Sequence, residues 1–149
     1  PVADAKTPAA ALERSEAFLR QYASDPLITP AVAPHALYTN SEETLKACRA
    51  LANRHAKPLV IHVSETKKEN DEMKAKYGGR TPVEVLSEWG IFDGPTIAAH
   101  VIWVDEKDIR LLAEKKVGLA HCPSSNMKLA SGVAPVLAQQ AAGLKVGLG

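Results

Sequence analysis

The chain has 149 residues, of which 46% are hydrophobic and 5% aromatic, so it is long enough for one domain with a core of Ala, Val and Leu. Its net charge of +1 provides no field for nucleic acid or an anionic membrane, and we expect a small-molecule partner. No apolar stretch reaches the roughly 18 residues of a membrane span. Cys48 and Cys122 lie far apart without a pairing framework, which fits a reducing cytoplasm.

The first predicted elements are a helix and a strand. The chain begins at Pro1 without Met or a signal-peptide pattern, so we expect a further segment upstream. An apolar stripe at helical spacing predicts a helix from Pro8 to Tyr22. The apolar run Leu27–Ala33 predicts a buried strand with irregular, proline-marked ends, and His35 follows it in a loop.

The remainder of the chain continues this alternation of helix and strand. The expected elements are a helix from Asn40 to about Lys57, a strand over Pro58–Val63, a charged helix over Lys67–Tyr77, a short helix over Pro82–Trp89, a strand over Thr96–His100, a helix from Asp105, a strand over Gly118–His121, a long polar loop over Ser124–Gly132, a helix over Pro135–Ala142 and a last strand from Leu144. Such alternation is typical of βα units around a parallel sheet, so the predicted fold class is α/β.

Four of the five histidines stand at the carboxyl ends of apolar runs: His35, His62, His100 and His121. The carboxyl ends of parallel strands form the rim at which substrates bind, so this placement predicts one shared site. The fifth, His55, lies near the predicted end of a helix, where an imidazolium interacts favourably with the helix dipole. We therefore interpret His55 as structural.

The sequence His62-Val63-Ser64-Glu65 carries the clearest chemistry. A neutral imidazole can ligate zinc, and a carboxylate three residues later can shuttle a proton without being a ligand. An isolated His-x-x-Glu is more often a hydrogen-bonded histidine with a solvated glutamate. Its position at a strand end favours the catalytic interpretation.

The sequence allows two roles for each of the other residues near the strand ends. His100 polarises a reacting centre or is a core imidazole bonded to backbone, and His121 faces the site or simply precedes the turn at Cys122-Pro123. The segment Ser124–Lys128 binds a polar substrate or is a solvated turn. The spacings between His62, His100 and His121 each allow one helical crossover between neighbouring strands.

Taken together, these motifs resemble the metal-dependent amidohydrolases. The resemblance rests on Pro34–Thr39, His62–Thr66, Ala99–Trp103 and His121–Gly132, and it covers nearly the whole chain. It is strongest to the 5-methylthioadenosine/S-adenosylhomocysteine deaminase group, with guanine deaminases and triazine hydrolases as relatives. The resemblance implies a (β/α)₈ TIM barrel, of which this chain covers roughly strands four to eight with their helices.

The resemblance also implies roles for individual residues. His62 becomes a ligand of one divalent metal, expected to be Zn²⁺, although Fe²⁺ or another ion is an alternative. Glu65 becomes the proton shuttle that also touches the substrate, His35 a substrate contact, and His100 a hydrogen-bonding group at the reacting centre. His121 would begin a loop that lines the rim.

Two features of the family pattern are missing. No two histidines are separated by one residue, so the first-strand His-x-His ligand pair is absent, and the chain stops at Gly149, where a Thr-Asp-Gly turn with a further ligand is expected to begin. We therefore expect residues 1–149 to be part of an amidohydrolase catalytic domain, inactive in isolation. One ligand cannot fix a catalytic metal, which normally has at least three from protein.

The expected activity of the intact parent is deamination of adenosine-type purines by metal-bound hydroxide. One alternative is an aminohydrolase or chlorohydrolase acting on guanine or triazine rings. Another is a non-catalytic half-barrel that associates with itself, because an open sheet exposes strand edges and apolar faces.

Overall fold

The computed structural model describes residues 5–149, and residues 1–4, on which the expectation of an upstream segment rests, lie outside the described part. The elements in chain order are α1 (Pro8–Gln21), the 3₁₀ turn η1 (Leu37–Thr39), α2 (Glu42–Arg54), β1 (Leu59–Val63), α3 (Lys67–Lys76), α4 (Pro82–Glu88), β2 (Thr96–His100), α5 (Glu106–Glu114), β3 (Gly118–His121), α6 (Pro123–Lys128), α7 (Val136–Ala141) and β4 (Val146–Leu148).

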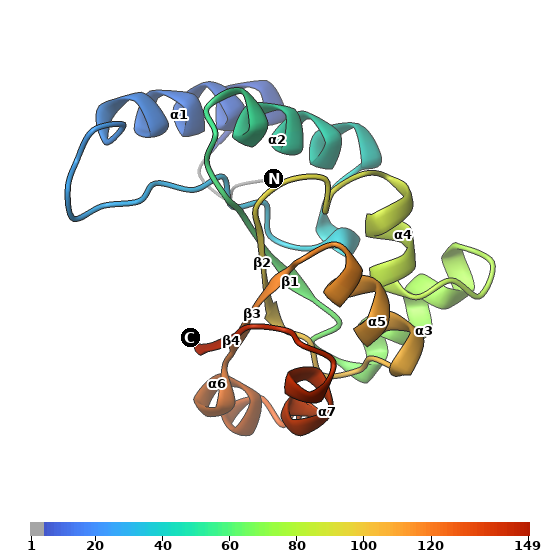
Figure 1. Ribbon diagram of the computed structural model, residues 1–149. Helices are drawn as coiled ribbons and strands as arrows, with labels where there is room; N and C mark the ends of the chain where they lie inside the picture. The colour runs from blue at the N-terminus through green and yellow to red at the C-terminus, as the bar shows by residue number, and fades with distance from the viewer. Residues whose placement is uncertain (1–4) are drawn as a thin grey trace.

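The four strands form one parallel sheet in which spatial order equals chain order, β1-β2-β3-β4. Parallel neighbours need a crossover connection, and each pair of consecutive strands here is joined through one or two helices. Helices α3, α4 and α5 lie along one side of the sheet (Figure 1). Sequential parallel strands with helices outside them are the arrangement of a barrel section.

The two faces of the sheet differ in burial. In β1, Leu59, Ile61 and Val63 are fully buried, whereas Val60 and His62 between them are partly exposed. Ile97, which is paired with Val60 on the neighbouring strand, is 38% exposed. The side chains of a strand alternate between its faces, so one face packs into the hydrophobic core and the other is partly open to solvent.

The prediction of a buried strand over Leu27–Ala33 is wrong. This segment forms only an isolated parallel bridge from Val32 to Leu59, and Leu27 is 93% exposed. Proline supplies no ladder donor, and Pro30 lies within the run, so regular pairing is interrupted. The end of the segment nevertheless follows the edge of β1, because the amide of Val60 donates to the carbonyl of Val32 at 2.9 Å, and just beyond the segment the amide of His62 donates to the carbonyl of His35 at 3.0 Å.

The predicted polar loop over Ser124–Gly132 is also wrong in its first half, where the structure has helix α6. Proline needs no donor at a first helical position, and Pro123 begins this helix. The helix is short and Asn126 is its one buried residue, so it lacks the apolar periodicity that identifies longer helices. Among the described residues, no helix combines the length and apolar character needed to span a membrane.

Candidate active site at the carboxyl ends of the strands

Three of the strand-end histidines lie side by side. The ring centroids of His35 and His62 are 5.1 Å apart, and those of His62 and His100 are also 5.1 Å apart. His35 is exposed, His62 is partly buried and His100 is 6% exposed, so the row runs from solvent into the protein. The structure therefore brings together the three histidines that the sequence placed after successive strands.

His62 occupies the centre of this row on β1. Burial lowers the pKa of His62, and the neighbouring rings of His100 and His35 lower it further. A lowered pKa keeps the imidazole neutral near physiological pH, which is the form that ligates metals. The neutral form of His62 is thus suited to ligate a metal.

His100 reaches His62 only because the backbone of β2 departs from regular strand geometry. The register pairs His100 with Val63, so strict alternation would direct the His100 side chain to the face opposite His62. Instead, His100 and the next residue, Val101, have φ angles of 70° and 47°. These left-handed conformations are unfavourable for residues other than glycine, and they concentrate at functional sites.

Glu65 faces His100 across the site. Its Oε1 lies 3.7 Å from Nε2 of His100, and its side chain is only 14% exposed. The preceding residue, Ser64, has a φ of 51°, so the chain turns sharply at the end of β1 and directs Glu65 toward the rim. A carboxylate and an imidazole at this distance can both contact one small reacting group.

Asn126 contacts His100 from the opposite side. Its Oδ1 lies 2.8 Å from Nδ1 of His100, and Asn126 is 3% exposed. An amide oxygen only accepts, so Nδ1 donates to it and Nε2 remains directed at Glu65. Sequence reasoning treated residues 124–128 only as a polar segment and missed Asn126 as an individual residue, because its importance depends on the unpredicted helix α6.

Two further histidines lie apart from this group. No ring contact, hydrogen bond or ion pair between described residues connects His121 to the other three, and its Nδ1 is buried without a hydrogen-bond partner. His55 caps the C-terminus of α2 and its Nε2 lies 2.9 Å from Oε1 of Glu16 on α1. The structural interpretation of His55 is confirmed, since it ties α2 to α1.

The described residues alone do not complete a metal centre. Within residues 5–149, no group of three or more His, Cys, Asp or Glu side chains could hold a metal ion. His62 can offer one nitrogen, whereas protein metal centres with catalytic function normally use at least three ligands. The chain therefore presents acid–base and hydrogen-bonding groups beside one candidate ligand.

A separate cavity of about 330 Å³ lies between α1, α2 and the segment before η1. Its wall is largely apolar and includes His35 and Cys48, but not His62, Glu65 or His100. Burial raises the pKa of the Cys48 thiol to about 11, so this cysteine is not a nucleophile at neutral pH. The cavity therefore shares His35 with the histidine row but is lined by neither of the other two histidines nor Glu65.

Comparison with known proteins assigns the family. The model of the amidohydrolase family matches residues 3–149, and the chain belongs to this family. It is 42% identical over 149 residues to a 5-methylthioadenosine/S-adenosylhomocysteine deaminase of Aquifex aeolicus, covering 100% of this chain and 34% of the relative. It is 46% identical over 134 residues to a 5'-deoxyadenosine deaminase of Methanothrix thermoacetophila, covering 90% of this chain and 32% of the relative.

Solved structures give the same result for the fold. An adenosine deaminase from Xanthomonas campestris with bound zinc matches with a TM-score of 0.93 at 36% identity, covering 100% of this chain and 34% of that structure. A guanine deaminase from C. acetobutylicum with bound guanine matches with a TM-score of 0.88 at 27% identity, covering 97% and 35%. The predicted α/β section of a barrel is confirmed, and the chain spans about a third of the length of these proteins.

Proposed function

We propose that this chain is a section of a metal-dependent hydrolase that deaminates adenosine-type purines. The observation that carries the proposal is the convergence of His62, Glu65 and His100 from two neighbouring parallel strands. The names of the relatives support this reaction class and make 5-methylthioadenosine, S-adenosylhomocysteine and 5'-deoxyadenosine the first substrates to test.

Each residue of the group has a proposed role. His62 would be one ligand of a divalent metal, with zinc as the first candidate because the Xanthomonas campestris deaminase contains it, and the other ligands would come from outside residues 5–149. Such a metal supplies Lewis-acid activation of water. Glu65 accepts one proton from the attacking water and delivers it to the ring nitrogen. The second proton of that water passes from the hydroxyl of the tetrahedral adduct to the amino group, which then leaves as ammonia. His100 hydrogen-bonds the reacting centre through Nε2, which faces Glu65, and the exposed His35 contacts the substrate.

The test uses the full-length protein that carries this chain. Ammonia release from the three adenosine derivatives is compared with ammonia release from guanine and chloride release from a chlorotriazine. Glu65→Gln is expected to lower kcat by roughly 10²–10⁴-fold, the usual contribution of general acid–base catalysis.

His55→Gln is the matched control, because it changes a histidine that ties α2 to α1 away from the site, and it should retain the wild-type kcat. Chloride release without ammonia release would contradict the deaminase proposal. Undiminished ammonia release in the Glu65→Gln variant would contradict the role given to Glu65.

A further inference from the structure

Glu69 on α3 is a buried carboxylate that turns back toward the end of β1. It is 4% exposed, its Oε2 accepts from the amide of Glu65 at 2.8 Å, and its Oε1 accepts from the amide of Ser64 at 3.3 Å. Burial raises the pKa of Glu69, and the backbone hydrogen bonds lower it. The sequence placed Glu69 only within a charged helix, so nothing in the pattern distinguished it from its exposed neighbours.

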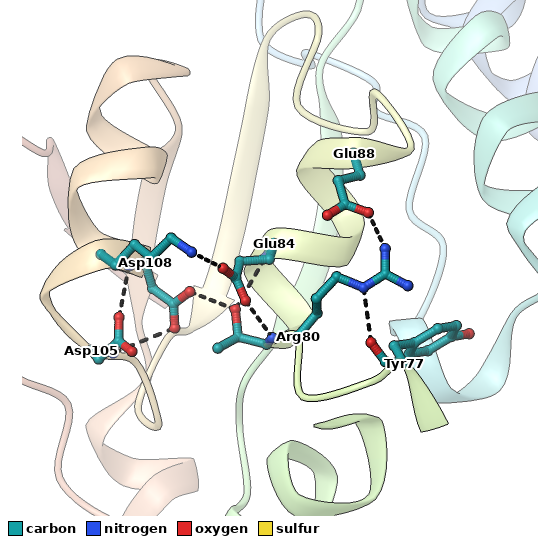
Figure 2. Close-up of polar contacts among 8 residues, drawn as sticks. Tyr77, Arg80, Glu84, Glu88, Asp105 and Asp108 are labelled. Carbon is teal, nitrogen blue, oxygen red and sulfur yellow. Dashed lines mark hydrogen bonds and ion pairs between the residues drawn. The ribbon is translucent and has the colours of Figure 1, made fainter. Parts of the chain in front are cut away.

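The contact of the Glu69 carboxylate with the amides of Ser64 and Glu65 differs from ordinary capping of a helix. In α4 and α5, the carboxylates of Glu84 and Asp108 at the third helical position accept from the amide of their own N-cap residue, as Figure 2 shows. In α3 the N-cap is Thr66, whose hydroxyl accepts from the amide of Glu69 at 3.1 Å. The Glu69 carboxylate bypasses Thr66 and binds the two residues before it. Its position therefore fixes the turn between β1 and α3 in addition to the helix start.

The turn that Glu69 holds is the one that directs Glu65. Ser64 has a φ of 51°, and its carbonyl accepts from the amides of Ile102 at 3.1 Å and Trp103 at 3.0 Å. Those two amides directly follow the left-handed residues His100 and Val101. Ser64 is thus held from both sides, by the α3 carboxylate on its N–H and by the loop after β2 on its carbonyl.

We propose that Glu69 is a positioning residue that fixes the Ser64–Glu65 backbone and so holds the Glu65 carboxylate at its distance from His100. The proposal rests on the proposed deaminase function, in which Glu65 moves protons. Displacement of a proton-transfer group by about 1 Å can lower the rate 10²-fold, so a carboxylate that never touches substrate can still affect kcat.

Glu69→Gln is the test variant. Two backbone donors converge on the two carboxylate oxygens, but an amide offers one oxygen and turns a second donor toward the remaining N–H. We expect kcat to fall roughly 10- to 100-fold with little change in KM, because the misplaced group acts in the chemical step. Hydrogen exchange at the amides of Ser64 and Glu65 should become faster.

Thr66→Ala is the matched control at the same helix start. It removes the N-cap hydroxyl and leaves both contacts of Glu69 with the preceding amides. This variant should lower Tm while retaining kcat. A loss of kcat in Thr66→Ala equal to that in Glu69→Gln would show that any weakening of α3 lowers the rate, and would overturn the proposal.

A double variant separates positioning from general destabilisation. If Glu69 acts through Glu65, adding Glu69→Gln to Glu65→Gln should lower kcat no further. A further multiplicative loss, or a wild-type kcat in Glu69→Gln, would overturn the proposal. If the wild-type protein deaminates none of the purines, the proposed function fails instead, and hydrogen exchange still decides whether Glu69 holds the turn.

Discussion

At the scale of single residues, backbone strain accumulates where β1 and β2 end. Ser64, His100 and Val101 have positive φ angles although none is glycine, and each sits beside a candidate site residue or is one. Surrounding side chains hold this conformation: buried Gln139 on α7 donates to the carbonyl of Val101 at 2.8 Å, and Glu69 accepts from Ser64. The strain is thus part of how the side chains reach one another.

The loop that leads from α6 to α7 packs tightly against this strained segment at Gly132. A Cβ at this position would lie 2.9 Å from Cγ2 of Ile102 and 3.3 Å from the indole of Trp103, and the φ of Gly132 is 126°. Gly132→Ala therefore combines backbone strain with overpacking. Gly79→Ala is the control, because its φ is 87° but nothing lies within 4 Å of an added Cβ.

We expect Gly79→Ala to lower the free energy of unfolding by about 1–2 kcal/mol, and Gly132→Ala to lower it by about 1–3 kcal/mol more. Urea denaturation of both variants measures the difference. Equal losses would mean that the loop moves away from Ile102 and Trp103 without penalty.

At the scale of elements, the sequence predicts those strands whose position depends on hydrophobic burial alone. Strands β2 and β3 end at His100 and His121 as their apolar runs do, and β1 extends one residue past His62 to Val63, so short runs bounded by turns are enough to find these strands. The run Leu27–Ala33 is as apolar, but its pairing is interrupted by proline and most of its apolar length stays uncovered. Composition alone does not distinguish that case from a strand.

Some features of the candidate site could likewise be predicted from the sequence, and others could not. Parallel topology brings strand ends to one rim, so the proximity of His35, His62 and His100 could be predicted from their positions after successive apolar runs. The orientation of His100 could not, because alternation assigns it to the wrong face and no glycine indicates the positive φ. Asn126 and Glu69 depend on tertiary contacts that have no periodic signal in the sequence.

Helices α4 and α5 are locked together at their N-termini. Thr81, the N-cap of α4, accepts from the amide of Glu84 and donates its hydroxyl at 2.5 Å to Oδ1 of buried Asp108 on α5, within the polar cluster of Figure 2. Lys107 pairs with Glu84 across the same junction. One hydroxyl thus serves both a cap and an interhelical contact.

Thr81→Ala should therefore destabilise the fold more than the loss of an ordinary cap. A cap contributes about 1 kcal/mol and an unsatisfied buried acceptor about 1–3 kcal/mol, so we expect a loss of roughly 2–4 kcal/mol in the free energy of unfolding. Ser41→Ala removes the N-cap of α2 and an exposed contact with the Thr44 hydroxyl, and it should lose about 1 kcal/mol. Chemical denaturation compares the two, and equal losses would argue against the contribution of the Asp108 contact.

At the scale of the whole molecule, the described sheet has an uncovered edge and an open face. β4 pairs only with β3, and Leu148 on this edge strand is 84% exposed. Leu137 on neighbouring α7 is 83% exposed, and Ile97 on the open face is 38% exposed. Unpaired backbone groups beside exposed apolar side chains favour pairing with another chain.

Because of this uncovered edge and open face, we expect the 149-residue chain by itself to associate. We also expect that it does not retain a metal. Sedimentation velocity over increasing concentration should show oligomers, and metal analysis should find well below one zinc per chain, because His62 is a single candidate ligand.

Leu148→Lys places a charge on the β4 edge and should shift the distribution toward monomer. Leu129→Lys is the matched control, since Leu129 is 62% exposed but lies at the end of α6 outside the sheet. A monomer that holds equimolar zinc would contradict both expectations, because it would require ligands and edge protection that residues 5–149 do not provide.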